Sequence, residues 1–211
     1  MPTEREESAN RWLTERSNVD GQAYDTTYTR RAAQGENVHG EADLVESFHP
    51  TSVLDAGCGT GRVGIELARR GIDVVGADID TRMLEAARQK APNIEWHLSD
   101  LLTLSLDRHF DAIVLAGNVM IFLTPGTEGA VLQNMARHLA PNGVLIAGFQ
   151  LQQDALTLHE YDQLAAAAGL VLATRYATWD GELWTPGANY AVSIHTRTDY
   201  TNNYVSSAIN L

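Results

Sequence analysis

Residues Val53–Gly61 read VLDAGCGTG, an apolar segment that runs into three closely spaced glycines. The apolar part has the composition of a short buried strand, and the amphipathic pattern of Arg62–Arg70 indicates a helix directly after the glycines. In an open α/β sheet, ligands bind at the carboxyl ends of the strands, and a glycine-rich first turn lets the backbone approach them closely. This stretch therefore predicts a strand, turn and helix that bind a nucleotide-like ligand.

The spacing of these glycines narrows the choice of ligand. The dinucleotide fingerprint requires a third glycine at position 62, where Arg62 stands, so the last glycine comes one residue early. Asp55 would face a pyrophosphate with the wrong sign, whereas its charge suits a ligand that carries an ammonium group. A phosphate-binding Walker loop is excluded because no Lys-Ser or Lys-Thr pair follows the glycines.

The chain from about residue 42 onward alternates short β-type runs with amphipathic helices. The last two β-type runs have no helical pattern between them, which indicates an antiparallel pair. We expect a doubly wound α/β fold with helices on both faces of a mostly parallel, seven-stranded sheet and an antiparallel C-terminal strand. The strands are expected at residues 52–56, 74–77, 94–98, 112–116, 144–149, 170–177 and 190–197.

Helix boundaries are predicted from capping residues. Asp80 or Thr81 suits the start of one helix, and Thr157 with Glu160 has the spacing of a capping box. Gly71 and Gly169 stand where a left-handed C-terminal cap is needed. A turn is expected at Pro141-Asn142-Gly143.

Three regions are expected along the chain: an N-terminal helical lid at 1–40, a core domain at 41–197 and a polar tail at 198–211. The 27 acidic and 15 basic residues give a net charge of -12, which disfavours nucleic acid and anionic membranes as partners. The single cysteine, the charged N-terminus and the lack of a long apolar run lead us to expect a cytoplasmic protein. The histidine spacing predicts no metal site.

Several segments in order are similar to the motifs of one enzyme family. VLDAGCGTG at 53–61 resembles motif I of the class I S-adenosylmethionine-dependent methyltransferases, and the resemblance extends over about residues 38–197. VGADID at 75–80 resembles motif II, and Asp100-Leu101 matches the position that receives adenine. FDAIVLAGN at 110–118 resembles motif IV, and LAPNGVL at 139–145 resembles the turn into the fifth strand, with Asn142 in place of a frequent glycine.

The resemblance implies S-adenosylmethionine as cofactor and S-adenosylhomocysteine as product. Asp78 would accept both ribose hydroxyls, Asp100 the adenine amine, and Ile79 and Leu101 would sandwich the adenine, although either could equally belong to the core. Asp78 could alternatively serve a helix N-terminus. The predicted cofactor-binding residues are Asp55, Ala56, Gly57, Cys58, Gly59, Gly61, Asp78, Ile79, Asp100, Leu101, Ala116 and Tyr28.

No catalytic residue is assigned, but three candidates are noted: His39, Asn118 and Tyr28. Tyr24 and Tyr28 lie four residues apart and share a helical face. They resemble the aromatic residues that close over the cofactor in related enzymes, or they fasten the N-terminal segment to the domain. The loop with Trp179, Asp180 and Trp184 could line the acceptor site or cover a sheet edge.

The resulting hypothesis is methyl transfer to a small-molecule acceptor by in-line displacement. A regulatory module that binds the cofactor without transfer, or a protein methyltransferase, remains an alternative. An amine or thiolate acceptor needs little help from a base, whereas a hydroxyl benefits from one. The acceptor and the oligomeric state are not predicted.

Overall fold

The fold is built around one seven-stranded sheet. The computed structural model describes residues 10–16, 19, 21–152 and 155–197. The strand order is β3-β2-β1-β4-β5-β7-β6. The strands are β1 (Ser52–Ala56), β2 (Asp73–Asp78), β3 (Glu95–Leu98), β4 (Phe110–Leu115), β5 (Leu139–Gln150), β6 (Leu170–Tyr176) and β7 (Tyr190–Arg197).

The direction of the strands confirms the predicted mixed sheet. β3, β2, β1, β4 and β5 are parallel neighbours, whereas β7 runs antiparallel to both β5 and β6. The loop at 177–189 that joins β6 to β7 contains no helix, which agrees with an antiparallel pair, because parallel neighbours are usually joined by a crossover helix. The order reverses between β1 and β4, so the carboxyl ends of these two strands border the crevice where this fold binds ligands.

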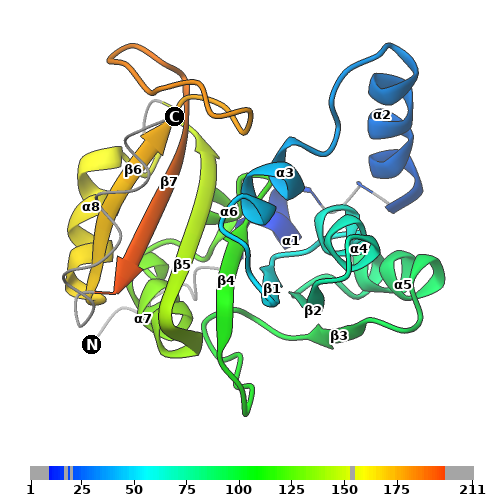
Figure 1. Ribbon diagram of the computed structural model, residues 1–211, viewed down its shortest axis with the longest axis horizontal. Coiled ribbons are helices and arrows are strands. Elements are labelled where there is room, and N and C mark those ends of the chain that lie inside the picture. The colour runs from blue at the N-terminus through cyan, green and yellow to red at the C-terminus, as the bar shows by residue number, and fades with distance from the viewer. Residues whose placement is uncertain (1–9, 17–18, 20, 153–154, 198–211) are drawn as a thin grey trace, which may run out of the picture.

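Helices cover both faces of the sheet (Figure 1). Helices α3 (Gly40–Glu46) and α4 (Arg62–Arg69) pack on one face, and α7 (Glu128–His138) and α8 (Leu158–Ala167) on the other. Helix α5 (Thr81–Lys90) packs beside β2 and β3. Two large apolar clusters result, because alternate residues of each strand point to opposite faces, and a smaller third cluster surrounds Trp96.

The predicted helix ends are confirmed by their hydrogen bonds and backbone angles. Asp80, rather than Thr81, caps α5 by accepting a hydrogen bond from the Arg82 amide. Thr157 and Glu160 form the reciprocal capping box of α8. Gly71 and Gly169 have φ angles of +89° and +77°, the left-handed conformation of a helix C-cap.

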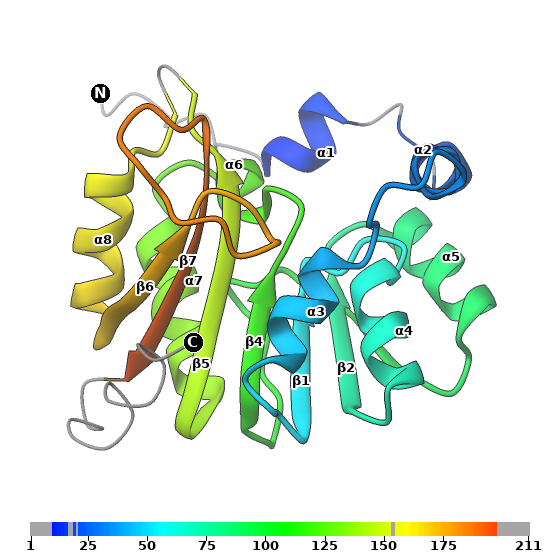
Figure 2. The same ribbon diagram turned by 45° about the horizontal axis from the view of Figure 1, so that its top comes forward.

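Two short helices, α1 (Arg11–Glu15) and α6 (Val119–Phe122), and the longer α2 (Gly21–Ala33) lie on the side of the carboxyl ends of the parallel strands. Figure 2 shows α1 and α2 on that side of the sheet, with α1 near α6 and α2 above α5. The polar α2 has no continuous apolar stripe, so its place depends on contacts with the core rather than on its own pattern.

The fifth strand differs from its prediction. β5 begins at Leu139 instead of Val144, because Leu139 already pairs with Phe110 before the register shifts and the regular ladder starts at Ala112 and Val144. Asn142 supplies the positive φ of +69° that this irregular segment needs. The predicted polar tail at 198–211 lies outside the described residues. None of the described helices is long and apolar enough to cross a membrane.

Candidate cofactor and acceptor site

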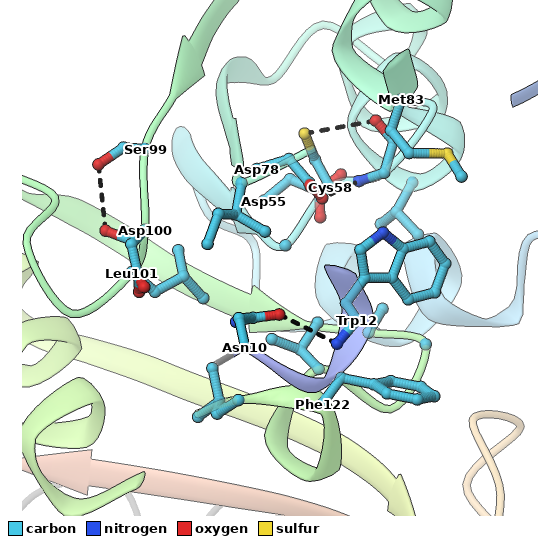
Figure 3. Close-up of a pocket in the computed structure, with 18 of the residues that line it drawn as sticks. Asn10, Trp12, Asp55, Cys58, Asp78, Met83, Ser99, Asp100, Leu101 and Phe122 are labelled. Atoms are coloured by element: carbon cyan, nitrogen blue, oxygen red, sulfur yellow. Dashed lines mark hydrogen bonds between the residues drawn. The ribbon is translucent and has the colours of Figure 1, made fainter. Parts of the chain in front are cut away.

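A cavity lies at the carboxyl ends of β1, β2 and β4, and Trp12 of α1 and Tyr24 of α2 contribute to its lining. Figure 3 shows Asp55, Asp78 and Cys58 on one side of it, Asp100 and Leu101 on a second, and Trp12 and Phe122 facing them. The lining residues are Asn10, Trp12, Tyr24, Asp55, Gly57, Cys58, Gly59, Arg62, Val63, Asp78, Ile79, Met83, Ser99, Asp100, Leu101, Ala116, Gly117, Val119, Phe122 and Leu123.

The three glycines of the 53–61 loop are each required for a different physical reason. Gly57 has a φ of +78°, and a Cβ atom there would lie 2.5 Å from Val119 Cγ2. Gly59 lines the cavity with open space where its Cβ would be. Gly61 instead faces the indole of Trp96, whose Cη2 atom would lie 2.6 Å from a Cβ. The third glycine of the motif therefore serves packing, and the first two border the cavity.

Asp78 is held firmly at the end of β2. Its Oδ2 accepts a hydrogen bond from the Gly59 amide at 2.7 Å, and its Oδ1 accepts one from the Asp80 amide at 2.8 Å. Burial raises the pKa of Asp78 above its ordinary value, and the hydrogen bonds from Asp80 and Gly59 oppose this shift. Each carboxylate oxygen has a second lone pair, so both can still accept a bond from a ligand hydroxyl.

Asp55 lies deeper, at the end of β1, with only 2% of its surface exposed. Its Oδ2 accepts a hydrogen bond from the Gly64 amide at 2.9 Å. Burial raises the pKa of Asp55 to about 7, against the lowering effect of that bond. Burial also raises the pKa of the Cys58 thiol, which therefore stays protonated. A cationic ligand beside Asp55 would favour its ionised form.

The segment after β3 provides the third carboxylate. Asp100 Oδ1 accepts a hydrogen bond from the Leu102 amide at 2.8 Å, which fixes the start of a turn. Buried Asn134 of α7 donates to the carbonyl oxygens of Leu101 and Leu104, both at 2.8 Å. This amide, which sequence reasoning missed, fastens the segment from behind, because an isolated Asn in an amphipathic helix carries no signal of its partners.

Helices α1 and α2 together form a cover over the cavity. Trp12 of α1 holds one side of this cover in place. The Trp12 indole nitrogen donates to Asp80 Oδ2 at 3.0 Å, and its ring packs edge-on against Phe122 with centroids 5.5 Å apart. Trp12 thus connects the end of β2 with α6, next to β4. Trp12 was not among the predicted site residues, although an aromatic residue in a polar N-terminal segment is a visible signal.

Helix α2 is fastened through Asp25. Its Oδ1 accepts a hydrogen bond from the hydroxyl of fully buried Thr60 in the glycine loop, and its Oδ2 pairs with Lys90 of α5, both at 2.6 Å. Gly21 lies so close to α5 that a Cβ atom would be 2.8 Å from that of Ala86. The Asp25 carboxylate therefore connects the cover to the 53–61 glycine loop and to helix α5.

The structure brings most of the predicted cofactor residues to the cavity. Exceptions are Ala56, inside the sheet core, Gly61, against Trp96, and Tyr28, whose ring is covered by the Arg62 guanidinium at 4.1 Å. Tyr24, one helical turn before Tyr28, lines the cavity instead. This exchange could not be foreseen, because both tyrosines lie on the same helical face.

The other catalytic candidates also lie outside the cavity lining. His39 precedes α3 with its ring 3.9 Å from Glu66, and 42% of its side chain is exposed. Asn118 adopts a left-handed φ of +72° at the start of α6, and its Oδ1 accepts a hydrogen bond from the Gln150 amide at 2.7 Å. The chain that the structure describes contains no cluster of three or more His, Cys, Asp or Glu side chains able to hold a metal ion.

Comparisons with known proteins agree with this geometry. A family model described as a methyltransferase domain matches residues 53–143. The solved structure of a TehB-like SAM-dependent methyltransferase from Corynebacterium glutamicum is 32% identical, with a TM-score of 0.78 over 84% of this chain and 97% of that chain.

Curated relatives match over shorter stretches. A dTDP-3-amino-3,4,6-trideoxy-alpha-D-glucopyranose N,N-dimethyltransferase from Streptomyces venezuelae is 33% identical over 58% of this chain and 54% of its own. A magnesium-protoporphyrin O-methyltransferase from Rhodobacter capsulatus is 34% identical over 40% of this chain and 39% of its own. The chain thus spans about half or less of the length of these two relatives.

The sheet order and the cavity at its switch point define a Rossmann-like fold of the class I methyltransferase type. The chain belongs to the S-adenosylmethionine-dependent methyltransferase family. The residues present fit that cofactor, because three carboxylates, Asp55, Asp78 and Asp100, face the cavity beside the apolar side chains of Ile79 and Leu101.

Proposed function

We propose that this protein transfers a methyl group from S-adenosylmethionine to a small-molecule acceptor and leaves S-adenosylhomocysteine. The observation that carries the proposal is the cavity at the ends of β1, β2 and β4, with carboxylates that suit a cationic cofactor without phosphate groups. The protein's net charge of -12 adds to the preference for a cationic over a polyanionic ligand.

The roles of individual residues follow from their places around the cavity. Asp78 would accept the two ribose hydroxyls with its remaining lone pairs. Asp100 would accept the adenine amine, with Ile79 and Leu101 on either side of the ring. Asp55 and the backbone at Gly57 and Gly59 would hold the methionine portion, whose ammonium group compensates the buried carboxylate.

The cofactor supplies an electrophilic sulfonium methyl group, so the main task of the chain is to position the reactants. Alignment of two bound reactants supplies roughly 7–11 kcal/mol of a barrier. Trp12 and Asp25 hold α1 and α2 over the cavity through their contacts with Asp80 and Thr60. We expect this cover to exclude water from the bound reactants and to favour small acceptors over a folded protein surface.

The class of acceptor is supported by the relatives named above, which are named for a sugar nucleotide amine and a porphyrin. Both are small molecules, although one name specifies nitrogen and the other oxygen. We therefore propose a small molecule as acceptor and leave the acceptor atom to experiment.

The proposal is tested by incubating the protein with methyl-labelled cofactor and a panel of amines, alcohols, thiols and carboxylic acids. We expect label in one class of compound and an equal amount of S-adenosylhomocysteine. Calorimetry with S-adenosylhomocysteine accompanies the assay. Binding without transfer to any panel member would instead support a regulatory cofactor-binding module, and the absence of binding would contradict the proposal altogether.

A further inference from the structure

One part of the cavity wall combines apolar groups with a single phenol. The residues from the end of β4 and from α6 that line it are apolar or glycine: Ala116, Gly117, Val119, Phe122 and Leu123. Tyr24 of α2 faces this wall, and its Oη lies 3.6 Å from where a Cβ atom on Gly117 would be. The Tyr24 hydroxyl therefore points to the end of β4, where no side chain intervenes.

A stack of three other side chains holds Tyr24 in place. Its hydroxyl lies 3.3 Å from that of Tyr28, within hydrogen-bonding distance. The Arg62 guanidinium covers the Tyr28 ring at 4.1 Å, donates to the Val38 carbonyl at 2.6 Å and pairs with both carboxylate oxygens of Glu41. Arg62 and Glu41 are each only 13% exposed, so this pair is a rigid, partly buried support.

The hydrogen bond between the two phenols leaves Tyr24 able to accept a further hydrogen bond. Burial and the neighbouring Tyr28 raise the pKa of Tyr24, so Tyr24 remains a neutral phenol. Whichever of the two hydroxyls donates, Tyr24 Oη keeps at least one lone pair that can accept a hydrogen bond from the cavity.

We propose that Tyr24 Oη contacts the reacting atoms at the transferring methyl group, and that Tyr28, Arg62 and Glu41 are positioning residues that hold it there. The inference rests on the proposed methyltransferase function. The acceptor's lone pair forms the new bond to the methyl carbon while the electron pair of the broken carbon–sulfur bond stays on sulfur. Tyr24 accepts a hydrogen bond from the acceptor's N–H or O–H and orients that lone pair, and the acceptor's proton leaves to water afterwards.

The test uses two cofactor analogues and needs no knowledge of the acceptor. S-adenosylhomocysteine lacks the methyl group, whereas sinefungin carries an ammonium group in the position of that methyl group. Calorimetry on the full chain and on Tyr24→Phe gives the affinity ratio of the two ligands. We expect Tyr24→Phe to weaken sinefungin binding by about tenfold, as the loss of a hydrogen bond to a charged group predicts, and S-adenosylhomocysteine binding by less than twofold.

Two further variants complete the test. Tyr28→Phe should lower the same ratio by about threefold, because Tyr24 then loses its fixed direction. Tyr161→Phe is the matched control, since Tyr161 of α8 is fully buried against Phe149 and His195 and its hydroxyl has no hydrogen-bond partner among the described residues. Its ratio should equal that of the unaltered protein.

The outcomes separate this inference from the proposed function. If the unaltered protein binds both ligands and Tyr24→Phe changes both affinities by the same factor, the role of Tyr24 is refuted while the proposed function stands. If the unaltered protein binds neither ligand, the proposed function itself fails.

Discussion

The two sides of the cavity are built in different ways. The floor consists of β1, the glycine loop, α4 and the end of β2. Asp78, at the end of β2, accepts hydrogen bonds from the backbone amides of Gly59 and Asp80. The cover consists of α1 and α2, which reach the floor through single side chains such as Trp12 and Asp25. The floor is thus fixed mainly by backbone hydrogen bonds, and the cover by a few polar contacts between side chains.

This difference indicates a division of work. Backbone hydrogen bonds within a packed sheet open only with larger unfolding events, whereas a helix held by a few polar contacts opens at lower free energy. We therefore expect the floor to determine cofactor affinity and the cover to determine how fast ligands enter and leave. Five predictions test this comparison, from the largest expected effect to the smallest.

Asp78→Ala, a change in the floor, should weaken cofactor binding more than any of the other variants. The loss of the ribose contacts costs about 2–3 kcal/mol of binding free energy, or a rise in Kd of roughly 30- to 150-fold for S-adenosylhomocysteine by calorimetry. Glu95→Gln, which alters an exposed acid on neighbouring β3, is the control and should leave Kd within twofold. An Asp78→Ala affinity equal to that of the control would disprove the assignment to the ribose.

Gly76→Ala should destabilise the support beneath the floor. A Cβ atom on Gly76 would lie 2.2 Å from two ring atoms of Trp96, and the Trp96 indole is held by its bond to the Ala91 carbonyl at 2.9 Å. We expect a loss of about 2 kcal/mol in the free energy of unfolding, measured by denaturant titration. Trp96→Leu in the same chain should recover part of this loss, and strictly additive effects would contradict the proposed clash.

The pH dependence of cofactor binding should report the ionisation of the Asp55 carboxyl group. Because burial raises its pKa to about 7, Asp55 is protonated in the empty site below that pH, and a cationic ligand must displace the proton. The affinity for S-adenosylmethionine should therefore rise by about tenfold from pH 6 to pH 8 and level off above the folded pKa. Calorimetry in buffers of different ionisation enthalpy measures the proton released.

The free energy of unfolding of the ligand-free protein should fall as the pH rises, whereas the affinity for the cofactor should increase. The raised pKa means that the folded protein binds the Asp55 proton more tightly than the unfolded chain, so this contribution is complete at low pH and is lost as the pH rises through the folded pKa. Asp55→Asn should remove both dependences. An unchanged pH profile in Asp55→Asn would show that another group is responsible.

Asp25→Ala should act on the cover alone. The variant loses the bonds to Thr60 and Lys90, which together are worth about 1 kcal/mol for this partly exposed carboxylate. The dissociation rate of S-adenosylhomocysteine, followed by stopped-flow tryptophan fluorescence, should rise about three- to fivefold. Glu36→Ala, which removes a solvent-exposed partner of Arg31, is the control and should not change the rate. Equal rates in the two variants would show that Asp25 does not hold the cover.

Much of the floor could be predicted from the sequence because its signals are local. Asp55, Gly57, Asp78 and Asp80 lie at strand ends or helix starts that neighbouring residues define, and the structure places each of them there. Gly61 shows the limit of such reasoning. Its place in the motif suggested the ligand, whereas its neighbour is Trp96, 35 residues further on, whose direction no local pattern reveals.

The sequence by itself determined the alternating fold, the antiparallel last strands and the acidic side chains at strand ends, since periodicity, glycine spacing and caps act over a few residues. Only the tertiary structure decided that Tyr24 rather than Tyr28 borders the cavity, and that Trp12, Asp25 and Asn134 fasten its walls. These contacts join segments distant in sequence, and their geometry follows from how the whole sheet packs.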